Sequence, residues 1–276
     1  MQEYFRLLNN YYDKIYVLSL HRASERKGYI DNVLKGLDFE YFWGVDKEET
    51  SLEKIKDLGL YSSDQYHLFY KNPEEISLGM LCCSLGHVGI YKDIVKNGYK
   101  KTLILEDDVV PIVPNLKYFQ EIIDELPGDW ELFYLGYEKN EEFGWKQKLK
   151  QTIFKIFPLH AQLKLNRKMY FNYYPRNFTK HIAIAGFHDC THAYSVTLEG
   201  AKKLLQCQQP VRFNPDNLLS YMICTNQIKG YISYPKLFNQ LSAFKGKIES
   251  LTGNRPFTGH ISSYHKHRTF IDSYIR

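Results

Sequence analysis

The feature that most limits how this chain can fold is an apolar run that ends in three adjacent carboxylates. Residues 102–111 read Thr-Leu-Ile-Leu-Glu-Asp-Asp-Val-Val-Pro. A buried strand cannot continue into three charges without leaving the core. We therefore expect Glu106, Asp107 and Asp108 at the carboxyl edge of a sheet, where open α/β folds bind their ligands. The alternative is a solvated loop in which one Asp caps the next helix.

Three adjacent carboxylates also favour a bound cation. At a separation of about 4 Å and an effective dielectric near 20, each like-charged pair costs roughly 4 kcal/mol. A divalent ion such as Mg²⁺ or Mn²⁺ turns this repulsion into attraction, and it prefers oxygen ligands. A metal held there could in turn bind a diphosphate, so the triplet predicts a metal-dependent site.

Predicted strands and helices alternate along the chain. Strands are expected at residues 15–20, 39–43, 102–105, 130–135, 192–196 and 230–234. Helices are expected through residues 30–37 and at 52–60, 77–96, 115–126, 197–205 and 217–223. This alternation predicts an α/β fold with a mainly parallel central sheet and helices on both faces.

Length and composition narrow the class of protein. The 276 residues suit one large domain, 1–276, with a substantial core. There is no run of about 18 apolar residues, and the first residues lack the pattern of a secretory signal. Five cysteines form an odd set without metal-ligand spacing. We expect a cytoplasmic protein whose thiols are reduced and mostly buried.

Residues 138–180 form a basic, aromatic insertion. Residues 139–180 hold ten Lys or Arg against two Glu, a local charge of +8 that leaves −3 on the rest of a chain of net charge +5. No nucleic-acid motif accompanies these cations, so no nucleic-acid partner is expected. One helical face would carry apolar side chains flanked by lysines, namely Trp145, Leu149, Ile153, Ile156 and Phe157 beside Lys146, Lys148, Lys150 and Lys155. This predicts a helix lying on an anionic membrane surface, with a mobile flap or solvated helix as the alternative.

The tail 244–276 contains further cations, Lys245, Lys247, Arg255, Lys266 and Arg268. These residues could extend the same basic surface or fold over an acceptor cleft.

Seven segments, in order along the chain, resemble glycosyltransferase family 25, which includes bacterial lipooligosaccharide galactosyltransferases and collagen hydroxylysine galactosyltransferases. Leu105-Glu-Asp-Asp-Val109 matches the family's acidic motif, and Ser77-Leu-Gly-Met-Leu-Cys-Cys-Ser-Leu-Gly-His87 is similar to its Leu-Gly…Cys…Ser-His helix. The other segments are 15–26, 44–46, 191–205, 214–219 and 234–240. Cys82, Gly86 and Ser19 depart from the family pattern at the edge of the donor pocket.

The resemblance implies a GT-A fold and inverting transfer of a hexose, most commonly galactose, from a UDP-sugar donor. The acceptor would be a hydroxyl of a lipooligosaccharide or another surface glycan. Residues 11–137 would form the nucleotide-sugar-binding half, and 181–276 the acceptor half and tail. A lipid-linked acceptor would place the protein peripherally at the inner membrane face.

The resemblance also suggests roles for the carboxylates. Asp108, with help from Glu106 or Asp107, would hold Mn²⁺ or Mg²⁺ and so stabilise the leaving diphosphate. Asp216 is the favoured general base, typically worth about 10²–10⁴-fold in rate, and Asp189 is the alternative base or a further metal ligand. Asp216 could instead cap the helix that follows it.

Residues for binding the donor are expected at strand ends. Arg22 and Arg26 lie between a strand and a helix, a position suited to gripping phosphate, or they are solvated arginines. Asp46 could contact the uridine or ribose, as could Tyr16 or Ser19. The further donor-binding candidates are Asp107 and His87, and the alternative for His87 is a hydrogen-bonded histidine of the core.

Two other classes of function share these features. A metal-dependent nucleotidyltransferase or phosphodiesterase also needs clustered carboxylates, but it would make no new glycoside from a UDP-sugar. A non-catalytic sugar-binding module would keep the groove without turnover, and metal-dependent hydrolysis of a UDP-sugar would exclude it.

Overall fold

A computed structural model describes residues 1–141, 144–157, 163–165 and 167–243. The basic tail predicted at 244–276 lies outside the described residues, as do residues 142–143, 158–162 and 166 of the basic insertion. The predicted role of the tail therefore stays a prediction.

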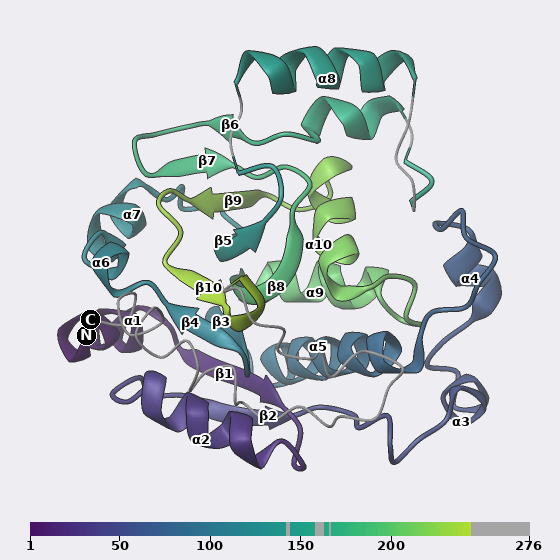
Figure 1. Ribbon diagram of the computed structural model, residues 1–276, viewed down its shortest axis with the longest axis horizontal. Coiled ribbons are helices and arrows are strands. Elements are labelled where there is room, and N and C mark those ends of the chain that lie inside the picture. Colours follow the sequence, from purple (N-terminus) through teal and green to yellow (C-terminus); the bar gives the residue numbers. More distant parts are fainter. Residues whose placement is uncertain (142–143, 158–162, 166, 244–276) are drawn as a thin grey trace.

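In the described part of the chain, one sheet contains eight strands in the order β2-β1-β3-β8-β5-β9-β7-β6 (Figure 1). Six strands run in one direction, and two, β8 and β7, run in the opposite direction. This confirms the predicted α/β fold with a mostly parallel sheet. The strands are β1 (Lys14–Ser19), β2 (Glu40–Trp43), β3 (Lys101–Glu106), β5 (Leu132–Glu138), β6 (Arg176–Asn177), β7 (Ile182–Ile184), β8 (Asp189–Thr197) and β9 (Gly230–Ser233), with β4 (Val109–Pro111) and β10 (Phe238–Gln240) paired separately.

Helices cover both faces of this sheet, because the central strands are apolar on both sides. On β1, Tyr16 and Leu18 pack towards α5, α9 and α10, while Ile15 and Val17 pack towards α1, α2 and α7. The period of two in a strand separates these two cores. The helices are α1 (Gln2–Tyr11), α2 (Ser24–Val33), α3 (Leu52–Asp57), α4 (Ser63–His67), α5 (Leu78–Asn97), α6 (Val113–Leu116), α7 (Phe119–Glu125), α8 (Trp145–Ile156), α9 (Leu198–Cys207) and α10 (Pro215–Cys224), with 3₁₀ turns η1 (Arg167–Asn172) and η2 (Leu241–Ala243).

The position of β8 decides where the polar residues meet. β8 is inserted between β3 and β5 and runs antiparallel to both, with Leu105 opposite Ala193. Its amino end therefore lies at the same sheet edge as the carboxyl ends of β1, β3 and β5. Residues from both halves of the sequence thus converge at one edge.

Helix α5 packs along one face of the sheet. By length and composition alone, an 18-residue window of α5 could cross a membrane, but 61 % of that window is buried inside the fold. Its eleven buried positions include Leu81, Ile90 and Tyr91, which are completely buried. Burial of this extent is typical of a helix in the core of a protein. It explains why α5 is apolar although its sequence is not an uninterrupted apolar run.

Several predicted elements differ from the structure at their ends. The helix expected at 115–126 is divided into α6 and α7, and α6 begins earlier because Pro114 occupies its first turn. The helix expected at 217–223 starts at Pro215, with Asn214 as its N-cap. α1 is not predicted from the sequence at all. It is held in place by tertiary packing, since Phe5 and Leu8 are completely buried in the core on its side of the sheet.

Candidate functional site

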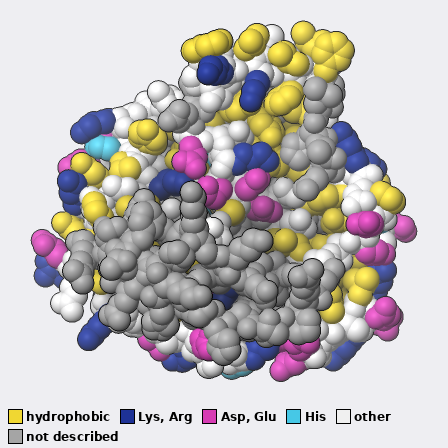
Figure 2. Space-filling model, viewed as in Figure 1, with side chains coloured by type: hydrophobic (Ala, Val, Ile, Leu, Met, Phe, Trp, Pro, Cys, Tyr) yellow, Lys and Arg dark blue, Asp and Glu magenta, His cyan; other side chains and the backbone are white. Residues whose placement is uncertain are grey.

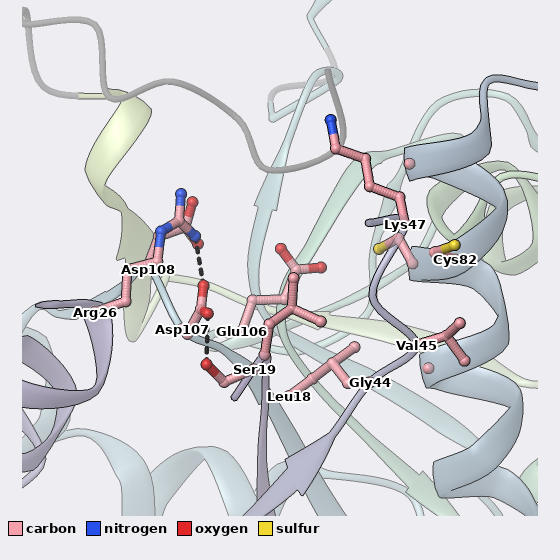
Figure 3. A pocket seen from close by; sticks show the side chains of 14 residues that line it. Leu18, Ser19, Arg26, Gly44, Val45, Lys47, Cys82, Glu106, Asp107 and Asp108 are labelled. Carbon is pink, nitrogen blue, oxygen red and sulfur yellow. Dashed lines mark hydrogen bonds and ion pairs between the residues drawn. The ribbon is translucent and has the colours of Figure 1, made fainter. Parts of the chain in front are cut away.

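A cleft opens at the carboxyl ends of β1 and β3, beside the amino-terminal half of α5 (Figure 3). Its cavity volume is about 120 Å³. One wall is apolar and is formed by Leu18, Gly44, Val45, Gly79 and Gly86, and the opposite rim carries charged side chains. The polar and charged side chains in the lining could bind a ligand; they are Ser19, Arg26, Lys47, Glu106, Asp107 and Asp108.

Small residues let α5 approach β1 closely. A Cβ atom added at Gly86 would lie 2.9 Å from a methyl carbon of Leu18, and one added at Gly44 would lie 3.2 Å from the same atom. Gly79, Cys82 and Gly86 repeat at helical spacing on one face of α5, and all three line the cleft. This spacing is visible in the sequence and indicates a helix face that lines a cavity; Cys82 and Gly86 are expected from the sequence at the edge of the donor pocket, whereas Gly79 is not.

Asp107 is paired inside the protein. Its Oδ1 accepts a hydrogen bond from Arg26, and its Oδ2 accepts one of 2.7 Å from Ser19. All three residues are 5 % exposed or less. Burial would lower the pKa of the Arg26 guanidinium, but the charges of Asp107 and then Asp108 hold that pKa above its usual value. Three predicted donor-binding residues thus contact one another, and they fix the turn after β3 against α2 (Figure 3).

Replacing Asp107 by Ala should cost about 3–5 kcal/mol of unfolding free energy, because it removes the buried carboxylate that binds the Arg26 guanidinium. Denaturant unfolding measures this loss. As a control, Asp31→Ala removes an exposed i,i+4 pair with Lys27 and should cost less than about 1 kcal/mol. Wild-type stability of Asp107→Ala would contradict a structural role for this pair.

Glu106, the last residue of β3, is held between two side chains. Thr191 donates a hydrogen bond of 2.5 Å to Glu106 Oε1, and His87 Nε2 lies 3.5 Å from the same oxygen. Burial would raise the pKa of Glu106, but the neighbouring His87 and the Thr191 hydroxyl hold it below its usual range. His87 is completely buried, and its Nδ1 is hydrogen-bonded to the Tyr194 hydroxyl at 2.8 Å. Glu106 is therefore a charged group at the rim of the cleft.

Asp108 differs from its two neighbours in the hydrogen bonding of its carboxylate. Among the described residues, its buried Oδ1 accepts no hydrogen bond. Burial raises the pKa of Asp108 to about 7; Arg26 opposes the rise, and the charges of Glu106 and Asp107 add to it. A buried carboxylate of this kind is costly until a cation binds it. The chemistry of Asp108 and Glu106 therefore fits Mn²⁺ or Mg²⁺, which bind carboxylate oxygens.

Cys83, predicted from the sequence only as a reduced, buried thiol, lies close to Glu106 and His87. The potential ligand atoms of Cys83, His87 and Glu106 all lie within 4.8 Å of one another. Burial, followed by the charge of Glu106, raises the pKa of the Cys83 thiol well above its usual value, so the thiol stays protonated at neutral pH. Because Cys83 and His87 are four residues apart on α5, helical spacing is the signal that links them.

Arg22 and Asp46 also bind each other. Arg22 Nε lies 2.5 Å from Asp46 Oδ2, and Asp46 Oδ1 accepts a hydrogen bond of 3.0 Å from the Glu48 amide. Neither residue is among those that line the cleft, whereas the neighbouring Lys47 is. Figure 3 shows the Lys47 side chain extending past the open side of the cleft. Lys47 is thus a cation beside the site that was not predicted from the sequence.

Asp216 and Asp189 lie where α10 and β8 begin. Burial and the nearby Asp189 charge raise the pKa of Asp216 to about 6. Hydrogen bonds that Asp216 accepts from the amides of Asn217 and Cys190 oppose this rise. A carboxylate with a pKa near 6 is suited to take a proton at neutral pH. Asp189 is more exposed and lies 3.3 Å from Lys139 Nζ. The helix cap is Asn214, so the Asp216 carboxylate is not the N-cap.

Several known proteins are similar in sequence to this chain. A model of "Glycosyltransferase family 25 (LPS biosynthesis protein)" matches residues 12–219. A glycosyltransferase 25 family member of Anopheles gambiae is 28 % identical over 71 % of this chain and 29 % of its own length. Procollagen galactosyltransferase 2 of Homo sapiens is 23 % identical over 81 % of this chain and 32 % of its own length. The chain thus spans about a third of the length of these relatives.

Among solved structures, a glycosyltransferase involved in the glycosylation of the major capsid of PBCV-1 aligns over 84 % of this chain and 94 % of that chain. Its TM-score is 0.38 and its sequence identity 13 %, so this likeness carries no conclusion about function. The family model, in contrast, covers well over half of the chain and includes the cleft and the acidic triplet. The resemblance predicted from the sequence is confirmed, and the chain belongs to glycosyltransferase family 25.

Proposed function

We propose that this protein is an inverting, metal-dependent glycosyltransferase that moves a hexose, galactose in the first instance, from a UDP-sugar to a hydroxyl of a glycan. The observation that carries this proposal is a buried Asp108 oxygen that has no hydrogen-bond partner among the described residues, in a cleft that the charged Glu106 also lines. The family match and the similarity to procollagen galactosyltransferases support it.

The donor would lie in the cleft with its nucleoside against the apolar wall. Leu18 and Val45 offer apolar contact for the base, and Gly44 and Gly86 let the Leu18 side chain pack closely in this wall. The diphosphate would then reach the carboxylate rim, where Lys47 adds a positive charge. A divalent cation held by Asp108 and Glu106, when bound, would offset the charge that builds up on the leaving UDP.

Transfer with inversion needs a base on the acceptor side. The acceptor oxygen would form a bond to the anomeric carbon while the bond from that carbon to the UDP oxygen breaks and its electron pair leaves with UDP. Asp216 would take the proton of the acceptor hydroxyl, because burial has raised its pKa to about 6. Asp189 is the alternative base, since it lies close enough to influence the charge of Asp216.

For the acceptor we propose a hydroxyl of a lipooligosaccharide or another surface glycan carried on a lipid. The description of the matched family as LPS biosynthesis proteins supports this class. The proposed compartment is the cytoplasm, with peripheral association at the inner face of the membrane.

A screen of UDP-sugars with Mn²⁺ tests the reaction. UDP-galactose should release UDP faster than other UDP-sugars, and EDTA should abolish the release because the carboxylate rim would lose its cation. UDP release and new glycoside are measured together. Release of pyrophosphate, or cleavage of a diester without glycoside, would favour a nucleotidyltransferase or phosphodiesterase. Absence of turnover with every donor would favour a sugar-binding module.

A further inference from the structure

Helix α8 turns its apolar side away from the protein. At about 100° per residue, Trp145, Leu149, Ile153 and Ile156 fall within an arc of about 80°. These four side chains are 72 %, 57 %, 43 % and 55 % exposed. Figure 2 shows hydrophobic side chains along the outer edge of the molecule at the top of the view, where Figure 1 places α8. The usual rule for a surface helix, with its apolar stripe on the core, is reversed here.

The side of α8 that faces the protein is anchored by other residues. Gln151 is buried, and its Nε2 donates hydrogen bonds of 2.8 Å to the Tyr170 carbonyl and 3.0 Å to the Phe171 carbonyl. Phe154 packs against the rings of Tyr170 and Tyr173. Gln151 and Phe154 project on the side opposite the apolar arc. The outward direction of the arc is therefore set by specific contacts.

Lysines border the apolar arc on both sides. Lys146 and Lys150 project on one side of it, and Lys148 and Lys155 on the other. The helix contains no Asp or Glu, so it carries four positive charges. An apolar strip between two rows of lysine matches the boundary of an anionic bilayer, where acyl chains lie beneath negatively charged headgroups.

We propose that α8 docks on an anionic lipid bilayer, with this apolar arc inserted below the headgroups and its lysines in contact with them. Charge complementarity favours lipid over a second copy of the chain. A twofold contact would place the same face against itself, so the lysine rows of both copies would meet in a water-depleted contact.

This docking goes beyond the proposed reaction by assigning the surface that meets the membrane. The sheet order places β6 and β7 at one edge, and α8 lies over that edge in Figure 1. The donor cleft is built on β1 and β3, further across the sheet. A bilayer at α8 would therefore leave the donor side open to solvent. Vesicle binding and sugar transfer are measured separately, so failure of one is distinguishable from failure of the other.

Vesicle flotation of the full chain tests the proposal. The protein should float with vesicles of equal parts phosphatidylcholine and phosphatidylglycerol, and not with phosphatidylcholine alone. Replacing both Leu149 and Ile153 by Ser should lower the partition coefficient at least ~10-fold. The matched control replaces the exposed Leu58 and Leu68, 63 % and 61 % exposed and far from α8 in sequence, by Ser, and it should bind as the wild type does.

Charge and position are tested in the same assay. Replacing Lys146 and Lys150 by Gln should weaken binding to the anionic vesicles about 20- to 30-fold. Replacing Lys92 and Lys96, exposed at the same spacing on α5, should leave it unchanged. Vesicles should also shift tryptophan emission to the blue, and Trp145→Phe should remove this shift.

Three results would overturn the proposal. The first is equal loss of flotation in the α8 and control variants. The second is an emission shift that survives Trp145→Phe. The third is a dimer in analytical ultracentrifugation that Leu149→Ser with Ile153→Ser converts to a monomer, without any vesicle binding by the wild type. That last outcome would assign the surface to a second copy of this chain.

Discussion

Replacing Asp108 by Asn should lower Mn²⁺-dependent sugar transfer by about 10³-fold or more, while the fold stays at least as stable as the wild type. The loss of rate is expected because several kcal/mol of charge stabilisation on the leaving UDP depend on the bound cation. Stability should not fall, because the substitution removes a buried carboxylate oxygen that has no hydrogen-bond partner among the described residues. Burial raises the pKa of this carboxyl to about 7, which shows that its charge is disfavoured without a cation.

Initial rates of UDP release check the predicted loss of transfer, and thermal unfolding with and without Mn²⁺ checks the predicted stability. Mn²⁺ should raise the melting temperature of the wild type and not that of Asp108→Asn, and the rise should be larger at pH 8 than at pH 6 because the cation binds the deprotonated carboxylate. Asp57→Asn, an exposed change on α3, is the control and should behave as the wild type. Full activity of Asp108→Asn would remove this residue from the metal site.

Replacing Asp216 by Asn should lower transfer to the acceptor by about 10²–10⁴-fold, with little change in affinity for UDP. The reason is that an amide cannot take the proton of the acceptor hydroxyl. In the wild type the rate should rise with pH through about 6, because the base acts in its deprotonated form and burial places the pKa of Asp216 there. The variant should lose this rise.

The pH dependence of the transfer rate is measured between about pH 4.5 and 8, the range in which a carboxyl with a raised pKa titrates. Titration with UDP measures the affinity for UDP separately. Asp189→Asn is the matched comparison, because Asp189 is the alternative base. If Asp189→Asn removes the rise of rate with pH and Asp216→Asn keeps it, the roles are reversed. If both variants keep it, neither is the base.

Stability offers a control for the Asp216 variant. A carboxyl whose pKa is raised in the folded state destabilises the fold as pH rises from its unfolded value near 4 to its folded value of about 6. Above pH 6, Asp216→Asn should therefore unfold at the same or a higher denaturant concentration than the wild type. A lower midpoint would mean that its loss of activity includes damage to the fold.

Much of the fold follows from patterns in the sequence. Apolar runs near residues 15–20 and 102–105 become β1 and β3, and the helical spacing at 77–96 becomes α5, because buried strands and helices leave periodic patterns of apolar residues. The short strands β4, β6, β7 and β10 were not predicted. Strands of two or three residues are too short for a pattern and form only where a partner strand lies beside them.

The different partners of the three adjacent carboxylates could not be predicted from local sequence. Adjacent residues point to opposite sides of the chain, so their partners come from distant elements. Asp107 meets Arg26 and Ser19, Glu106 meets Thr191 and His87, and Asp108 keeps a buried oxygen without a partner among the described residues. These contacts join residues that are up to 88 positions apart.

The order of apolar and charged residues alone determined that three carboxylates would leave a buried strand at the ligand-binding edge of an α/β sheet, because charge cannot continue into a core. The family motifs determined the class of reaction to propose. Only the tertiary structure decided which carboxylate keeps a buried oxygen without a hydrogen-bond partner among the described residues, and that β8 brings Asp189 to this edge. Each of these depends on packing between segments far apart in the chain, which no local pattern encodes.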